Sequence, residues 1–259
     1  MGSTTANIPT WLGVAASATL VLIAILISWR ERLGLEREVA VAALRALVQL
    51  ALVGALLLFV FDRGGLPAAF GWLVIMVVIA GFVAGGRARS IPQARSHAWW
   101  GIGVAVTMTM GLLLVLGTID AVPRVVIPVG GMVVSTAMVT AGLGLQRTAD
   151  VVDDQRARIE ARLALGLSPR EAFLEPYRTA MRTALVPSVD TTKVVGLISL
   201  PGAMTGLILA GVDPWDAIRY QIVVMYMLLG AAFMAAVISA RLAQRSLFDD
   251  AERLVRTLQ

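Results

Sequence analysis

Apolar stretches long enough to cross a lipid bilayer recur along almost the whole chain. A helix needs about 20 apolar residues to cross a hydrocarbon core of ~30 Å, and only a helix satisfies its own backbone there. Seven stretches meet this requirement: residues 10–29, 39–61, 66–86, 98–117, 125–145, 187–211 and 217–240. The sequence therefore predicts an all-α, polytopic integral membrane bundle of about seven transmembrane helices, organised as a single transmembrane domain over residues 1–259.

The composition supports a lipid environment and argues against nucleic acid as a partner. Charged residues make up 15% of the chain and hydrophobic residues 58%, whereas a soluble domain carries roughly 25% charged residues. The formal charge of +5 comes from arginines between the apolar stretches. Such arginines set orientation in the bilayer, so we expect the lipid bilayer, and no nucleic acid, around this chain.

The arginines alternate between the links and predict an orientation. They gather in links 30–38, 87–97 and 146–186 and in the tail from residue 241, whereas the intervening links hold only Arg63, Arg124 and, at the mouth of the last stretch, Arg219. Basic links stay in the cytoplasm, which places the N-terminus outside and the C-terminus in the cytoplasm. The first stretch follows no basic residue, so it predicts a membrane anchor of a multi-pass protein in the cell inner (plasma) membrane.

Counting residues excludes several kinds of site. The chain has no cysteine and one histidine, His97, which exclude thiolate metal sites and multi-histidine sites. Its only lysine, Lys193, lacks the preceding glycine of a P-loop. No nucleophile–base–acid arrangement is visible, so we expect neither an enzyme nor a cofactor bound by this chain, and the residues identify no metal site.

The long link 146–186 predicts two helices outside the membrane. A charged helix is expected to end near Gly166, and Ser168 and Glu171 then form a capping box with Pro169 at the first helical position. Pro176 is expected to bend or end the second helix about two turns later. The unit is typical of a docking element, or of an amphipathic helix lying at the lipid headgroups.

Ionisable residues lie inside two of the apolar stretches. Arg45 and Gln49 are one turn apart, and Arg45 either snorkels to the interface or lines a path. Asp190 and Lys193 are three residues apart and can pair on one helix face. Pro201-Gly202 then interrupts the stretch. Such breaks are found at transport sites and also as simple kinks, and the nearby methionines, Met204 among them, are gap fillers or soft ligands.

Two resemblances follow from these segments. Glu160-Ala161, then Gly166, then Pro176 resembles the EAA coupling motif of ABC importer permeases, although Arg162 replaces the expected alanine. Nearly the whole chain resembles the FetB-type permeases linked to iron export, whose homologues include plant aluminium-tolerance proteins. The similarity runs through "AILISWRERLGLERE", "RALVQLALVG" and "VIPVGGMVVSTAMVTAGL". It is strongest from "LALGLSPREA" through "LVPSVDTTKVVGLISLPGAMTGLILAGVDPWDAIRYQI".

The resemblance implies the transmembrane permease subunit of an ABC transporter exporting iron or another metal ion. It implies a homodimer served by a separate ABC-type ATPase subunit, with ATP and Mg bound by that partner. The expected ATPase-coupling residues are Glu160, Ala161, Gly166, Ser168, Pro169 and Glu171. The expected translocation path contains Arg45, Gln49, Asp190, Lys193, Pro201, Gly202 and Met204.

Three other readings stay open at the level of sequence. An ion-gradient-driven secondary transporter could use Arg45, Asp190 and Lys193 for coupling. A retinal protein would need its lysine mid-membrane in the last helix, where Lys193 does not lie. A regulatory subunit that transports nothing is the third. Iron usually binds histidine, cysteine or carboxylates, and the stretches offer only Asp190, so the residues leave the substrate and direction open.

Overall fold

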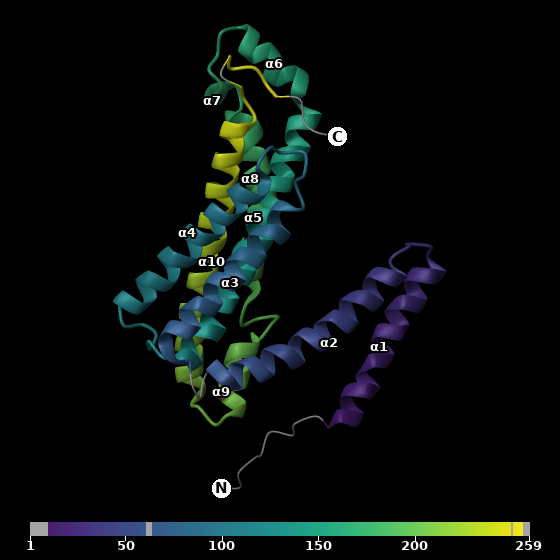
Figure 1. The fold of residues 1–259 in the computed structure, drawn as a ribbon, viewed down its shortest axis with the longest axis vertical. Coiled ribbons are helices and arrows are strands. Elements are labelled where there is room, and N and C mark those ends of the chain that lie inside the picture. The colour runs from purple at the N-terminus through teal and green to yellow at the C-terminus, as the bar shows by residue number, and fades with distance from the viewer. Residues whose placement is uncertain (1–9, 61–63, 250, 256–259) are drawn as a thin grey trace. The chain divides into compact units, whose positions relative to one another are not determined.

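The computed structural model describes residues 10–60, 64–249 and 251–255, and all regular structure in these ranges is helical (Figure 1). The predicted all-α class is therefore confirmed. The chain forms two compact units, one ending at Gly64 and the other beginning at Gly65. Six of the described helices are long and apolar enough to cross a membrane.

The first unit is a helical hairpin of α1 (Trp11–Arg30) and α2 (Glu36–Phe59). The Thr10 hydroxyl caps α1 by accepting a hydrogen bond from the amide of Gly13 at 3.3 Å. At the turn, the Ser28 hydroxyl donates to Glu36 at 2.8 Å and accepts from the amide of Leu35 at 3.1 Å. The remaining faces are mostly exposed and apolar, as lipid-facing helices require.

The second unit is a bundle built around two central helices, α5 (Pro123–Asp154) and α10 (Pro214–Ser246). Around them pack α3 (Gly65–Gly85), α4 (Ala94–Val115) and α8 (Leu174–Val194). Small residues let these helices approach closely. A Cβ atom at Gly101 of α4 would collide with Ser239 of α10, and one at Gly144 of α5 would press on Ala236.

The two central helices are longer than a bilayer is thick. With 32 and 33 residues at 1.5 Å per residue, each extends roughly 48 Å, against a hydrocarbon core of ~30 Å. Both extend toward the end of the bundle that carries α6 (Arg156–Ala164) and α7 (Pro169–Ala172) (Figure 1). Their length therefore leaves room for both helices to continue past the apolar layer at this end.

The stretch 187–211, predicted as one span interrupted at Pro201-Gly202, is a broken helix. Its first part belongs to α8, which runs through Pro187 and ends at Val194. Residues 195–201, here called the strap, are non-helical and lead into the short α9 (Gly202–Leu209). The predicted interruption at Pro201-Gly202 exists, but it begins earlier because Val195 is extended and Gly196 adopts φ +83°.

The long link also differs from its prediction at two positions. The charged helix divides at Gln155 into the end of α5 and α6, so it is not continuous up to Gly166. Pro176 neither bends nor ends a helix, because it lies in the first turn of α8, where its missing N–H has no helical partner to lose. The short helix it was expected to end, α7, stops earlier, at Ala172.

Candidate functional site

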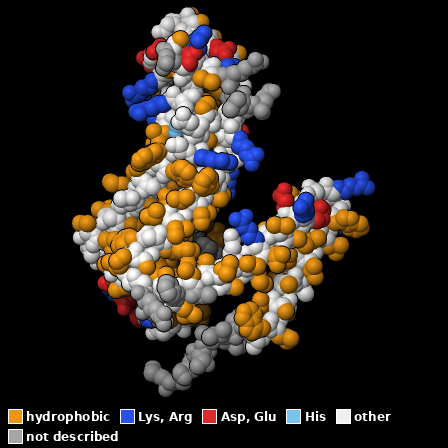
Figure 2. Space-filling model, in the orientation of Figure 1, with side chains coloured by type: hydrophobic (Ala, Val, Ile, Leu, Met, Phe, Trp, Pro, Cys, Tyr) orange, Lys and Arg blue, Asp and Glu red, His pale blue; other side chains and the backbone are white. Residues whose placement is uncertain are grey.

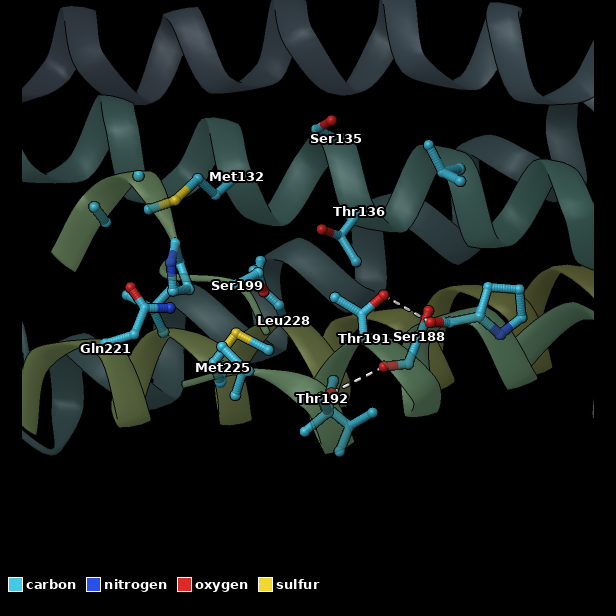
Figure 3. Close-up of a pocket in the computed structure, with 18 of the residues that line it drawn as sticks. Met132, Ser135, Thr136, Ser188, Thr191, Thr192, Ser199, Gln221, Met225 and Leu228 are labelled. Atoms are coloured by element: carbon cyan, nitrogen blue, oxygen red, sulfur yellow. Dashed lines mark hydrogen bonds between the residues drawn. The ribbon is translucent and has the colours of Figure 1, made fainter. Parts of the chain in front are cut away.

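A cavity of about 550 Å³ lies where α5, α8, the strap and α10 meet (Figure 3). It has a hydroxyl-rich part, where Thr136 of α5 faces Thr191 and Ser188 of α8. Near Gln221 and Met225 of α10, the lining also includes Met132, Ser199 and Pro201. The break in the α8–α9 segment thus lines a hollow between the two central helices.

A second cavity of about 520 Å³ adjoins the strap. Ser199 lines the first cavity, whereas Gly196 and Leu200 line the second. Both cavities share lining from Thr192, Val195, Pro201, Gln221 and Met225. The strap is therefore flanked by open volume, and Gln221 borders both spaces.

Three of the threonine hydroxyl groups that line the first cavity present acceptor oxygens, because their protons are already donated. Thr191 donates to the Pro187 carbonyl at 2.8 Å, and Thr192 donates to the Ser188 carbonyl at 2.9 Å. Thr140 likewise donates to a carbonyl of its own helix. Each hydroxyl has one proton and two lone pairs, so the oxygens that remain free can accept hydrogen bonds.

Gln221 is the most unusual polar residue of the cavity. It is only 6% exposed, and its Oε1 has no hydrogen-bond partner among the described residues. A buried acceptor left unsatisfied costs about 1–3 kcal/mol. Such a group is the polar atom that a ligand could satisfy.

Asp190 and Lys193 form the predicted ion pair, with Nζ and Oδ1 at 3.0 Å. Both side chains are more than half exposed, and neither lines the two cavities. Pro201 and Gly202 do line the first cavity, and Met204 lines the second. Arg45 and Gln49 are exposed on α2 in the other compact unit, and their place in a path stays a prediction.

The predicted coupling residues gather at the opposite end of α8. We call residues 155–181 with 247–249 and 251–255 the head. Glu160 pairs with Arg156 at 2.9 Å, Ala161 is exposed on the same helix, and Gly166 ends the turn after α6 with φ +85°. The head carries a dense group of acidic and basic side chains at its surface (Figure 2).

The capping box predicted for α7 is confirmed. Ser168 accepts from the Glu171 amide at 3.4 Å, and the Glu171 carboxylate accepts from the Ser168 amide at 3.1 Å, with Pro169 at the first helical position. Hydrogen bonds from the Ser168 hydroxyl and amide hold the pKa of Glu171 below its usual range. These bonds fix the exposed turn between α6 and α7.

Ion pairs within the head join α6 to the start of α8, and a ring contact joins the head to α10. Glu175 at the start of α8 accepts from Arg162 at 2.6 Å and from Arg158 at 2.9 Å. The Arg162 hydrogen bond and the Arg158 charge lower the pKa of Glu175. The Arg241 guanidinium of α10 lies 3.9 Å from the centre of the Tyr177 ring, and burial raises the pKa of Tyr177.

The C-terminal segment completes the head and was not foreseen from the sequence. Arg156 donates to the carbonyl of Leu254 at 3.2 Å, and the Phe173 and Phe248 rings pack edge to face at 6.3 Å. A groove of about 610 Å³ between α6 and this segment is lined by Glu160, Gly166 and Leu167, with Ala251, Glu252, Arg253 and Leu254 opposite. The expected coupling surface therefore includes the tail.

Sequence reasoning also missed the residues that give the cavity its chemistry. Thr136, Ser188, Thr191 and Gln221 come from three helices that are distant in sequence. The only available signal was a lone glutamine in the last apolar stretch, in "RYQIVVMYM". Within the described ranges, no group of three or more histidine, cysteine, aspartate or glutamate side chains could hold a metal ion.

The chain belongs to the uncharacterised protein family UPF0014, whose model matches residues 11–248. It is 41% identical to the UPF0014 membrane protein STAR2 of Oryza sativa over 93% of this chain and 84% of that protein. It is 38% identical to ALUMINUM SENSITIVE 3 of Arabidopsis thaliana over 93% and 88%. It is 36% identical to the probable iron export permease protein FetB of Escherichia coli over 94% of each. No solved structure matches the chain.

The expected resemblance to FetB-type permeases and plant aluminium proteins is thus confirmed at the level of the family. The chain is a multi-pass membrane protein of a family that includes a probable permease.

Proposed function

We propose that the chain is the transmembrane permease subunit of an ABC transporter that exports a metal species across the inner (plasma) membrane. A separate ATPase would hold ATP and Mg, and two copies of this chain would form the permease. The observation that carries the proposal is α8, one continuous helix of 21 residues that begins in the head and ends at the strap. The similarity to the probable iron export permease protein FetB of Escherichia coli supports export of iron.

The head is the proposed docking site for the ATPase. Its turn at Gly166 is exposed, because a side chain at this position would meet no described heavy atom within 4 Å apart from its chain neighbours. Basic side chains gather toward the head end of the second unit (Figure 2), as cytoplasmic segments require. We infer that this end is cytoplasmic and that α8–strap–α9 is a seventh crossing, which places the N-terminus outside.

The cavity beside the strap is the proposed transport site. Movement of the head would pass along α8, because this segment stays helical from the head to the strap, with only Pro187 removing a hydrogen bond from its interior. The strap would respond first, since it is non-helical and open volume flanks it. Exposure of the cavity would then alternate between the two sides of the membrane.

An ion-gradient-driven transporter is the main alternative. It would use Asp190 and Lys193 for coupling, but their pair is exposed and lines neither cavity. This placement favours coupling through the head.

The test is affinity purification of the chain from native membranes in mild detergent, with bound proteins identified by mass spectrometry. We expect a P-loop ATPase with the wild type and its loss with Gly166→Trp. Gly211→Trp is the matched control, because Gly211 also has a positive φ, +87° against +85° for Gly166, and open space around it, but lies between α9 and α10. Absence of an ATPase from the wild type, or its equal loss in both variants, would contradict the docking site.

A further inference from the structure

The two cavities beside the strap share an unexpected property, which is the absence of charge. None of the described residues that line either cavity carries a charge at neutral pH, and the phenol of Tyr226 is the only titratable side chain among them. A bare multivalent cation would lose its hydration there without a carboxylate to replace it, and hard cations depend on such oxygen ligands. The lining therefore disfavours a naked metal ion.

The lining equally disfavours an anion. Three of the threonine hydroxyls in the lining, those of Thr140, Thr191 and Thr192, already donate their protons to backbone carbonyls, at 2.9, 2.8 and 2.9 Å. Their free lone pairs are acceptors, which repel anionic oxygen atoms and attract hydrogen-bond donors. No arginine or lysine lines the described part of either cavity to balance a negative charge.

The apolar part of the lining favours a ligand with apolar faces. Met132 and Met225 flank the polar groups near the strap (Figure 3), and Leu228 and Val224 extend the apolar surface along α10. Thioether side chains adapt to irregular surfaces. The arrangement suits a compact ligand that has hydrogen-bond donors on an otherwise apolar exterior.

Gln221 is the polar residue positioned to select such a ligand. It borders both cavities and is 6% exposed, and its Oε1 has no hydrogen-bond partner in the part of the chain that the structure describes. A carboxamide carries no charge but both accepts and donates hydrogen bonds. A site that hydrogen-bonds its ligand rejects analogues that cannot pair with it, because its own buried group is then left unsatisfied.

We propose that Gln221 is the specificity-determining residue of this path, and that the path takes an electrically neutral ligand bearing hydrogen-bond donors. A metal would cross as a neutral organic complex, with its charge cancelled by its own ligands. This inference rests on the proposed transport function, which it deepens by naming the substrate class.

The test is equilibrium binding of radioactive iron to the purified full chain in lipid nanodiscs, without an ATPase. The first probe is the ferric tris(acetohydroxamate) complex, which is neutral and keeps N–H donors and methyl groups on its exterior. The second is anionic ferric citrate, and the third is the aqueous ferrous ion under reducing conditions. We expect saturable binding of the neutral complex only.

Three variants assign the binding to Gln221. Gln221→Leu is expected to weaken binding of the neutral complex by about tenfold, the effect of one lost hydrogen bond. Gln221→Glu is expected to weaken it as well and to create binding of the aqueous ferrous ion. Gln155→Leu is the matched control, because Gln155 also has a buried, unpartnered Oε1 but lies in the head. It should bind like the wild type.

Preferential binding of ferric citrate or of the aqueous ion by the wild type would overturn the proposal. Wild-type binding by Gln221→Leu, shown monodisperse by gel filtration, would overturn the role of Gln221, and binding of none of the three probes would overturn the substrate class. Because no ATPase takes part, these results are separate from the purification experiment, and either proposal can fail while the other stands.

Discussion

The head and the strap are the two ends of the same segment of chain, and they differ in how they are held. In the head, Ile159, Phe173 and Leu247 are fully buried, and the groups of Arg162, Glu175 and Ser168 are paired. In the strap, Leu197 and Ile198 are 88% and 81% exposed, and cavities flank the backbone. Regions with few buried contacts open at low free-energy cost, so the head is suited to receive a force and the strap to yield.

The largest expected difference in stability is between a truncation to alanine in the head and a truncation to alanine in the strap. Phe173→Ala removes a fully buried ring that packs on Phe248, which costs roughly 3–5 kcal/mol. Leu197→Ala removes an exposed side chain, and we expect less than about 0.5 kcal/mol. Hydrogen exchange of the backbone amides of α6 and α8 in detergent measures the loss of stability in both variants. Similar losses of protection in the two variants would remove the distinction between head and strap.

A smaller effect is expected from the acidic residue that joins α6 to α8. The pKa of Glu175 is lowered in the folded chain, chiefly by its hydrogen bond from Arg162. The contribution of Glu175 to the stability of the folded chain is therefore fully present at pH values above its unfolded pKa, near 4.5. This contribution is lost as the pH falls through the lower pKa that Glu175 has in the folded chain. Proteolytic cleavage within α6 should rise over that acidic range in the wild type.

Glu175→Gln should be cleaved more readily at neutral pH and show a flatter profile. The pKa values of Glu171 and Asp249 are also lowered, so the informative quantity is the difference between wild type and variant. Glu160→Gln serves as the control, because Glu160 pairs with Arg156 within α6 and does not reach α8. Parallel profiles for wild type and Glu175→Gln would show that the pair does not hold the head.

The smallest expected effect concerns the contact between α8 and α10. Arg241→Met removes the cation above the Tyr177 ring while keeping an unbranched side chain, at a cost of about 0.5–1 kcal/mol. Tyr177→Phe retains the ring and should cost less. Thermal unfolding of the detergent-purified variants shows which of the two substitutions destabilises the chain more. A larger loss for Tyr177→Phe would assign the contact to the phenol hydroxyl instead.

The sequence predicted the features that depend on neighbouring residues. Ser168, Pro169 and Glu171 specify a capping box through local hydrogen bonds, and Asp190 and Lys193 pair because they share one helix face. Pro201 interrupts the apolar stretch wherever the bundle places it. These elements need no knowledge of tertiary packing.

The features that depend on distant segments could not be predicted. Hydropathy marks only the apolar parts of α5 and α10, so it did not show that each continues as one helix up to the head. Pro176 was misplaced because the start of α8 depends on the burial of Phe173 and Tyr177. Gln221 gains its role only where α10 meets Thr191 of α8 and Met132 of α5. The orientation, the homodimer and the ATPase stay predictions.

The central claim is that the head controls the strap through α8, and cysteine labelling tests it most directly. The chain has no cysteine, so Ser199→Cys places a single thiol on the strap at the first cavity. Its reaction rate with a maleimide is measured in the complex with the partner ATPase, with ATP trapped and without nucleotide. The account predicts rates that differ severalfold between the two states and become equal when Gly166→Trp is added. Equal rates in both states of the intact complex would contradict it.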